Sequence, residues 1–264
     1  MLPSGPAGVR PYFVDRASAV RHDSRPSTNT RQPPGPEADL VARFLEIWPL
    51  RPRFGFRIKL FEQPKLQSGR PDMVAVVWDE NASIHWSRSD GGLNRAELRL
   101  LHLLVTAGPS DVVDLGARLP DLRSDSIDRL ESTGLVALKR HRIAPRRLTE
   151  ILAVRAVVAI EAKIDNWRSV LTQARLNQWF ASESYVLAPG VNDRSKLLGL
   201  ASAFGIGVWT ISANGFAQRL AAQLPLRFPV SYGTWLFNEW LRSDFDVRDE
   251  PFSTRSPMVS RDIS

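Results

Sequence analysis

Apolar residues in the first part of the chain follow one helical pattern and several strand-like runs. Residues 40–48 place apolar side chains at helical spacing, and Pro49 ends that pattern. The runs at residues 57–62 and 73–78 predict the two strands of a hairpin, and residues 82–86 predict a third strand. A helix followed by antiparallel strands therefore opens the globular part of the chain.

The pattern in the second part alternates between strands and helices. A continuous apolar run at residues 157–164 is typical of a strand buried on both faces. Asp165, Asn166 and Trp167 open a helix that we expect to reach about residue 182. The remaining predicted elements are a strand at 185–189, a helix and a strand within 195–211, and an aromatic amphipathic helix at 231–243. We expect this last helix to pack on the core, although an exposed aromatic face would instead make a dimer contact.

Asp72 and Glu161 are too far apart in sequence to lie on directly connected strands, so the intervening segment is predicted to be an insertion. Asn94 is a suitable N-cap for a helix at 95–107, and two shorter helices follow before Gly134. Two short strands come next, and three helices plus such a wing resemble a winged helix-turn-helix. We expect residues 94–147 to form a small lobe with an apolar core of its own around Leu101, Leu104, Leu115, Ile127 and Leu130.

The two ends of the chain are polar. Residues 1–36 are rich in Pro, Ser and Arg and predict a disordered basic arm, which is either a solvated tail or a tether for DNA. The expected organisation is an arm at 1–36, a core in two parts at 37–93 and 148–230, the insertion at 94–147, and a C-terminal helix with a polar tail at 231–264.

Composition narrows the class of protein. The 264 residues are 43% hydrophobic and 24% charged, which is typical of a globular protein. There are no cysteines, so disulfides and thiolate metal sites are excluded. We find neither an apolar run long enough for a membrane helix nor a secretory signal, and we therefore expect a cytoplasmic protein. The net charge of +7 favours a polyanionic partner, although an Arg-rich composition alone would produce the same charge.

The strongest chemical signal lies inside the apolar run at 157–164. Glu161 and Lys163 are two residues apart, so in a strand they share one face. Buried charges are costly unless they are paired or bind a metal. Asp72, which follows Gly69, Arg70 and Pro71, leads directly into another apolar strand. Magnesium-type cations are commonly held by one or two carboxylates with water and substrate phosphate, so these residues predict a metal-dependent phosphodiesterase.

This series resembles the PD-(D/E)xK nuclease superfamily. The matching residues are Pro71 and Asp72, then Glu161, Ala162 and Lys163, and the strand and helix order around them agrees. The resemblance implies an α/β fold with a restriction-endonuclease-like mixed central sheet flanked by helices, into which the winged-helix-like segment is inserted.

The resemblance also implies roles for individual residues. Asp72, Glu161 and the backbone carbonyl of Ala162 would bind Mg²⁺ or Mn²⁺, and Lys163 would stabilise the transition state or orient the attacking water. Gln173, on the helix after the second motif, would face the active centre. An acid from an upstream element often joins the site; Glu37, Glu46 and Glu62 are the candidates, and we favour Glu46 because it lies inside the first helix.

The insertion supplies a second candidate contact with nucleic acid. Its third helix carries three acids and only one arginine, so we do not expect it to read the major groove. The basic residues gather instead in and after the wing, where backbone contact with DNA competes with a structural or dimerisation role: Lys139, Arg140, Arg142, Arg146 and Arg147.

Other chemistries lack support in the sequence. There is no P-loop or dinucleotide fingerprint, so no nucleotide cofactor is expected, and the four histidines show no metal-ligand spacing. The sequence therefore predicts a metal-dependent DNA endonuclease or nickase, with a homodimer as one option. The competing hypothesis is a catalytically silent nuclease fold that serves as a DNA- or protein-binding regulator.

Overall fold

The computed structural model describes residues 13–15, 35–46, 50–83, 92–189, 194–212 and 215–248. The basic residues of the predicted N-terminal arm and the polar tail after residue 248 lie outside these ranges. The same is true of residues 84–86 in the predicted third strand. No helix within the described ranges combines the length and apolar character needed to cross a membrane.

Two local predictions are wrong. Residues 82 and 83 belong to a short helix, α2 (Glu80–Ser83), and not to a strand. Within the arm that we expected to be disordered, β1 (Phe13–Asp15) pairs antiparallel with β2 (Leu50–Pro52). A pairing partner so far along the chain cannot be inferred from the composition of the arm itself.

The centre of the molecule is a mixed six-stranded sheet with the order β11-β10-β9-β8-β4-β3. β4 pairs antiparallel with both β3 and β8, β8, β9 and β10 are parallel, and β11 returns antiparallel at the edge. The predicted α/β class with a mixed central sheet flanked by helices is therefore confirmed. The strands are β3 (Phe56–Glu62), β4 (Met73–Asp79), β8 (Val154–Ala162), β9 (Glu183–Pro189), β10 (Gly207–Ser212) and β11 (Gly215–Leu220).

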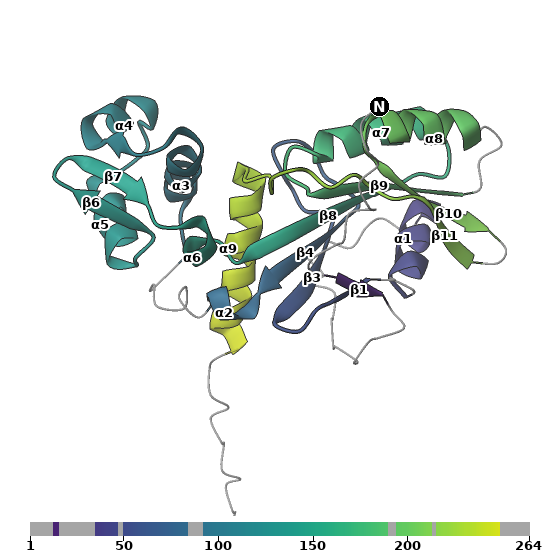
Figure 1. Cartoon of the computed structure of the whole chain (residues 1–264), viewed down its shortest axis with the longest axis horizontal. Helices are drawn as coiled ribbons and strands as arrows, with labels where there is room; N and C mark the ends of the chain where they lie inside the picture. Colours follow the sequence, from purple (N-terminus) through teal and green to yellow (C-terminus); the bar gives the residue numbers. More distant parts are fainter. Residues whose placement is uncertain are drawn as a thin grey trace, which may run out of the picture.

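Helices cover both faces of this sheet (Figure 1). On one face, Phe44 packs in a buried cluster with Val158 and Ile160 of β8. On the other face, Val157 and Ala159 belong to a different cluster that includes residues of the last helix. Side chains therefore alternate along β8 as they do in any strand that is buried on both sides. The helices concerned are α1 (Pro36–Glu46) on the first face and α7 (Trp167–Asn177), α8 (Arg194–Ala203) and α9 (Tyr232–Arg248) on the second.

The inserted segment forms helices and a hairpin where the sequence predicts them. Asn94 caps α3 (Arg95–Ala107) through a capping box with Glu97. The hairpin pairs β6 with β7, and a third short strand, β5 (Ser110–Asp111), joins β7 on its other side. The remaining elements are α4 (Val112–Arg118), α5 (Ser124–Ser132), β6 (Val136–Lys139), β7 (Arg142–Pro145) and α6 (Leu148–Ile151). Residues 92–151, which contain these elements, form the lobe of the molecule.

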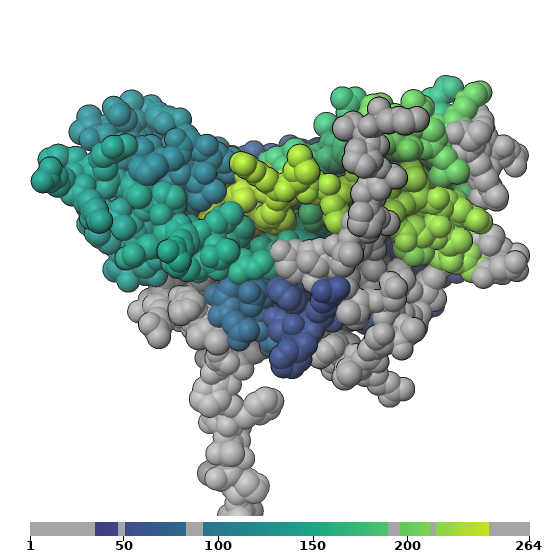
Figure 2. Space-filling view, viewed as in Figure 1, coloured from purple at the N-terminus to yellow at the C-terminus, as the bar shows by residue number. Residues whose placement is uncertain are grey.

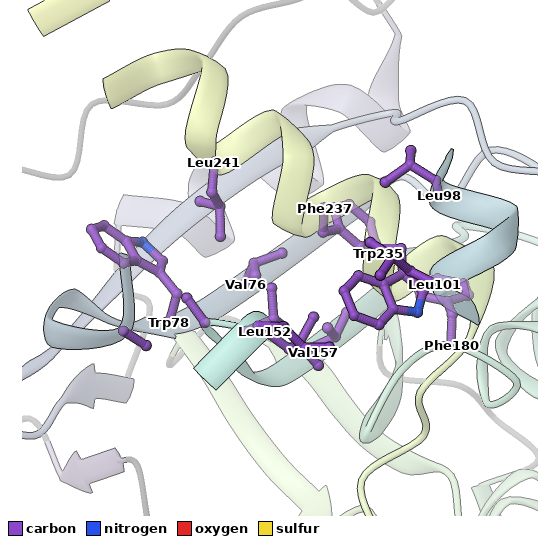
Figure 3. Packing of buried hydrophobic residues seen from close by; sticks show 14 of the residues in the cluster. Val76, Trp78, Leu98, Leu101, Leu152, Val157, Phe180, Trp235, Phe237 and Leu241 are labelled. Atoms are coloured by element: carbon purple, nitrogen blue, oxygen red, sulfur yellow. The ribbon is translucent and has the colours of Figure 1, made fainter. Parts of the chain in front are cut away.

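The apolar core of the lobe is not separate, contrary to our expectation. Leu101, Leu104, Leu115, Ile127 and Leu130 are buried in the same cluster that contains sheet and α9 residues. In Figure 3, Leu98 and Leu101 lie next to Trp235 of α9. The predicted packing of the aromatic C-terminal helix on the core is confirmed, because Trp235 and Phe237 are fully buried.

Polar groups of α9 fix both ends of the lobe. The backbone N–H of Leu93 donates to Glu239 Oε1 over 2.9 Å. At the other end, Ala153 and Val154 donate their backbone N–H groups to Asn238 Oδ1 over 2.9 and 3.4 Å. Because Asn238 and Glu239 are adjacent, the start of the lobe and the segment that directly follows it are both bound to the same turn of α9. In the space-filling view, the lobe and the α7–α8 layer rise on either side of a hollow (Figure 2).

A close approach of backbone and ring makes Gly207 hard to replace. A Cβ atom at this position would lie 2.1 Å from Cε1 of Tyr185, which is itself buried and donates a hydrogen bond to Glu183. We expect Gly207→Ala to lower the free energy of unfolding by about 1–3 kcal/mol, the usual cost of overpacking. Denaturant unfolding measures the change. Gly199→Ala is the matched control, because no atom lies within 4 Å of its added methyl group and it sits in a helix; destabilisation of equal size in both variants would contradict the prediction.

Candidate active site

The strand register places Asp72 and Glu161 on the same face of the sheet. Met73 at the start of β4 is paired with Ile160 in antiparallel β8. One residue further, Asp72 therefore lies opposite Glu161, and opposite residues of an antiparallel pair project to one side. The backbone N–H of Ala162 donates to Asp72 Oδ2 over 2.8 Å, which ties this carboxylate to the end of β8.

Glu161 is almost completely buried and has a defined partner. The side-chain amide of Asn177 donates to Glu161 Oε1 over 2.7 Å, and Glu161 is 4% exposed. Burial raises the pKa of Glu161 to about 8, and the negative charge of Asp72 adds to this shift. The bond from Asn177, the backbone of Asp72 and the charge of Lys163 act in the opposite direction. The protein groups around Glu161 therefore do not fully offset the cost of burying its ionised carboxylate.

Asp72 is in a similar electrostatic position. Burial is the largest cause that raises its pKa, and the charge of Glu37 adds to it. The Ala162 N–H, the Lys163 charge and a hydrogen bond from the side chain of Gln63 lower it. Two neighbouring acids with raised pKa values are suited to a divalent cation, which would offset their mutual repulsion.

Lys163 makes an ion pair with the first turn of α1. Its Nζ lies 2.8 Å from Oε1 and 3.0 Å from Oε2 of Glu37. The hydrogen bond with Glu37 is the main cause that raises the pKa of Lys163, and burial works against it. Lys163 is therefore held as a cation beside the carboxyl groups of Asp72 and Glu161.

The upstream acid that reaches the centre is Glu37, so the preference for Glu46 is not supported by the contacts. Glu46 lies nine residues further along α1, about 13 Å along the helix axis. Glu62 is paired with Met73, whose side chain packs in the cluster with α1, and register therefore directs Glu62 to the face opposite Asp72. The first turn of α1 points at the end of β8, and an acid at the beginning of the helix is the one in reach.

A second correction concerns α7. Asn177, and not Gln173, contacts Glu161, while Gln173 is exposed. A signal for Asn177 exists in the sequence. It lies seven residues after Val170 and three after Ala174, which places it on the buried stripe of α7. A polar residue on an apolar stripe is the position that needs a buried partner.

Gln63 also belongs to the site, and sequence reasoning missed it. It follows β3 and adopts a left-handed backbone conformation with φ 46°. Its backbone N–H donates to the carbonyl oxygen of Asp72 over 3.0 Å, and its side chain bonds the Asp72 carboxylate. Nothing in the local sequence distinguishes this glutamine from a solvated loop residue.

The basic residues of the wing are placed as a surface cluster. Lys139, Arg140 and Arg142 are exposed on the hairpin of β6 and β7. Arg146 and Arg147 are exposed just after it. Arg142 donates one hydrogen bond, over 3.4 Å, to the carbonyl oxygen of Pro109.

The third helix of the lobe offers little positive charge to a polyanion. Arg129, its one basic residue within Ser124–Ser132, forms an ion pair with buried Glu97 and also donates to the carbonyl oxygen of Gly92. Asp125, Asp128 and Glu131 are exposed on the same helix. The exposed charge of α5 is therefore mainly negative.

Within the described ranges, no group of three or more His, Cys, Asp or Glu side chains is arranged to hold a metal ion. The candidate centre instead brings together two carboxylates, those of Asp72 and Glu161. Two carboxylates suffice for Mg²⁺ or Mn²⁺ when water and phosphate complete the coordination shell. The oxygen donors and the raised acid pKa values thus fit a hard divalent cation.

Comparisons of the chain with protein-family models, with curated proteins and with solved structures find no match. Only the geometry and chemistry of the chain's own residues therefore bear on its function.

Proposed function

We propose that the protein is a metal-dependent nuclease, a DNA endonuclease or nickase of the PD-(D/E)xK type. The observation that carries this proposal is the placement of Asp72 directly opposite Glu161, with Lys163 two residues further along the chain. A pair of acids and a cation in this arrangement is what phosphodiester hydrolysis with a hard metal needs. The physical role of each residue follows from its contacts.

The order of elements supports the same proposal at the level of the fold. α1, β3, β4, β8, α7 and β9 follow one another in the chain, interrupted by the short elements β2 and α2 and by the lobe between β4 and β8. Asp72 precedes β4, and Glu161 lies near the end of β8. We infer a restriction-endonuclease-like core from this order, and a winged helix-turn-helix from the three helices and hairpin of the lobe.

Some residues of the centre would bind the metal ion, and Lys163 would stabilise the negative charge that develops on the phosphate. Asp72, Glu161 and the Ala162 carbonyl would hold Mg²⁺ or Mn²⁺, which when bound polarises the phosphoryl oxygen and acidifies water. The hydrogen bond from Asn177 to one oxygen of Glu161 would orient this carboxylate toward the ion. Lys163, kept protonated by Glu37, supplies positive charge where the pentacovalent phosphate becomes more negative.

The variant Lys163→Ala distinguishes a nuclease from a catalytically silent DNA-binding module. We expect Lys163→Ala to lower single-turnover cleavage by roughly 100-fold or more, the usual loss when one charge-stabilising group is removed, while DNA affinity falls only slightly. Cleavage of labelled duplex DNA with Mn²⁺ and binding by fluorescence anisotropy measure the two effects. Lys196→Ala, which removes an exposed lysine from α8, is the control. DNA binding by wild type without any cleavage would favour the catalytically silent module.

The wing is proposed to contact the DNA backbone. Replacing Lys139 and Arg142 by alanine and Arg140 by glycine should weaken binding without changing cleavage at saturating DNA. Glycine is chosen at position 140 because its φ is 56°. The salt dependence of log K should become shallower by up to about 2.7, at roughly 0.9 for each lost phosphate contact. A salt series of binding measurements tests this, with Arg95→Ala/Arg118→Ala as a lobe control; an unchanged slope would show that the wing serves another role.

A further inference from the structure

The connection between β3 and β4, residues 63–72, is a basic hairpin tip beside the candidate centre. Lys65 and Arg70 are both exposed, and Asp72 at the end of the segment is its one acid. Within the part of the chain that the structure describes, neither cation has a hydrogen-bond or salt-bridge partner. Among the described residues, therefore, no acid is paired with the two cations of this tip.

The tip is built as an ordered structure. Leu66 and Gly69 exchange backbone hydrogen bonds of 2.9 and 3.2 Å, and these bonds close the turn. Pro64 and Pro71, on the two sides of the turn, are buried. Since both prolines have a fixed φ, the positions of the neighbouring Lys65 and Arg70 are restricted.

The tip also lies on the correct face of the sheet. Leu66 packs against the cluster that contains Val74 and Val76 of β4. These two residues alternate with Met73 and Ala75 of the α1 face, and so they share the face of Asp72. The hairpin tip thus folds onto the side of the sheet where Asp72 and Glu161 lie.

Gln63 links the tip to the catalytic acid. Gln63 is a non-glycine residue with a positive φ of 46°, a backbone conformation that L side chains rarely adopt. This backbone conformation allows Gln63 to bond Asp72 with its main chain and its side chain together. Any group held by the tip is therefore held at a fixed position relative to Asp72.

The tip carries exposed cations, whereas the candidate centre beside it is rich in acids. Three acidic side chains, those of Asp72, Glu161 and Glu37, gather at the centre, and the cation Lys163 is paired with Glu37. Arg70 lies two residues from Asp72, a span of about 6–7 Å in extended chain, and duplex DNA rises about 3.4 Å per nucleotide. Arg70 and Lys65 can therefore reach phosphates within a few nucleotides of one bound at the centre.

We propose that Lys65 and Arg70 form a phosphate-binding site for the cleaved DNA strand, next to the scissile phosphate. This inference rests on the proposed nuclease function and adds the place where the substrate strand is held. The ligand is the sugar–phosphate backbone, so the site contributes affinity and position and no preference for base sequence.

The test is the double variant Lys65→Gln/Arg70→Gln, with the single variant Arg70→Gln beside it. Binding of a labelled 30-base-pair duplex is measured in the Glu161→Gln background, where no cleavage interferes, and cleavage kinetics are measured in the native background. We expect the double variant to lose roughly tenfold or more in affinity, and its salt slope to become shallower by about 1.8. KM should rise while kcat changes little. Arg118→Gln, an exposed cation on α4, is the matched control and should behave as wild type.

The outcomes separate this inference from the proposed function. Wild-type affinity, salt slope and KM in the double variant of an active nuclease would overturn the hairpin site and leave the nuclease standing. Hairpin-dependent binding by a protein that never cleaves would support the site and overturn the nuclease. A wild-type protein that neither binds nor cleaves DNA would overturn both. Unfolding curves of the variants exclude loss of structure as the cause.

Discussion

Metal-free Glu161→Gln protein should be more stable than wild type at pH 8.5 and no more stable at pH 4.5. The folded protein raises the pKa of Glu161 from 4.5 to about 8. Between these values the folded state binds a proton that the unfolded state releases, so the wild-type free energy of unfolding falls as pH rises through this window. A shift of this size corresponds to up to about 5 kcal/mol. Glutamine keeps the shape of the side chain and an oxygen for the Asn177 bond but cannot ionise.

Denaturant unfolding of both proteins at several pH values, in EDTA, measures this difference. Adding Mn²⁺ at pH 7.5 should stabilise wild type by about 2.7 kcal/mol when the ion is at 100 times its dissociation constant, and should leave the variant nearly unchanged. Exposed Glu131→Gln, on α5, is a control that should show neither effect. If the stability difference between wild type and Glu161→Gln does not depend on pH, the folded state does not disfavour the ionised form of Glu161, and the prediction is wrong.

Removal of the lobe should abolish cooperative unfolding. The lobe and α9 share one apolar cluster. Trp235 and Phe237 of α9 each bury a large aromatic ring in this cluster (Figure 3). Deletion of residues 94–147, with a short Gly-Ser bridge from Leu93 to Leu148, would expose that side of α9 and leave its polar groups without the lobe. We therefore expect a broad or absent transition in calorimetry and in denaturant unfolding.

A milder test uses the contact between α3 and α9. Leu101→Ala and Trp235→Ala should each cost about 2–5 kcal/mol, and their effects should not be additive because the two residues share the cluster. The triple wing variant is the control, because it changes exposed residues of the same lobe. A sharp two-state transition of the deleted protein at wild-type stability would show that the lobe is an independent domain.

The sequence predicts local elements well where their signals are local. Asn94 and Glu97 identify the start of α3 because both halves of the capping box lie within one turn. The apolar run that contains Glu161 identifies β8 because a strand buried on two faces needs apolar side chains on both. Glu161 and Lys163 could be identified because they are the charged residues of that run, and Asp72 because it directly precedes another apolar strand.

The errors arise where tertiary packing decides. Position inside the helix favours Glu46 over Glu37, but the direction in which α1 approaches β8 brings Glu37 to Lys163. The role of Gln63 depends on a left-handed backbone that its sequence does not signal. The apolar stripe of α3 predicts burial, but its partner α9 is more than a hundred residues away in the chain. An amphipathic pattern shows that one face of a helix is buried, but it does not show which element packs against that face.

Incubation of purified protein with supercoiled plasmid DNA tests the central claim most directly. Parallel reactions contain Mg²⁺, Mn²⁺ or EDTA, and Glu161→Gln protein purified in the same way reports any contaminating nuclease. We predict nicked or linear plasmid with wild type in Mg²⁺ or Mn²⁺, and supercoiled plasmid alone with EDTA or with Glu161→Gln. Intact plasmid in both metals, or equal cleavage by wild type and Glu161→Gln, would contradict the assignment of Asp72, Glu161 and Lys163 as a nuclease centre.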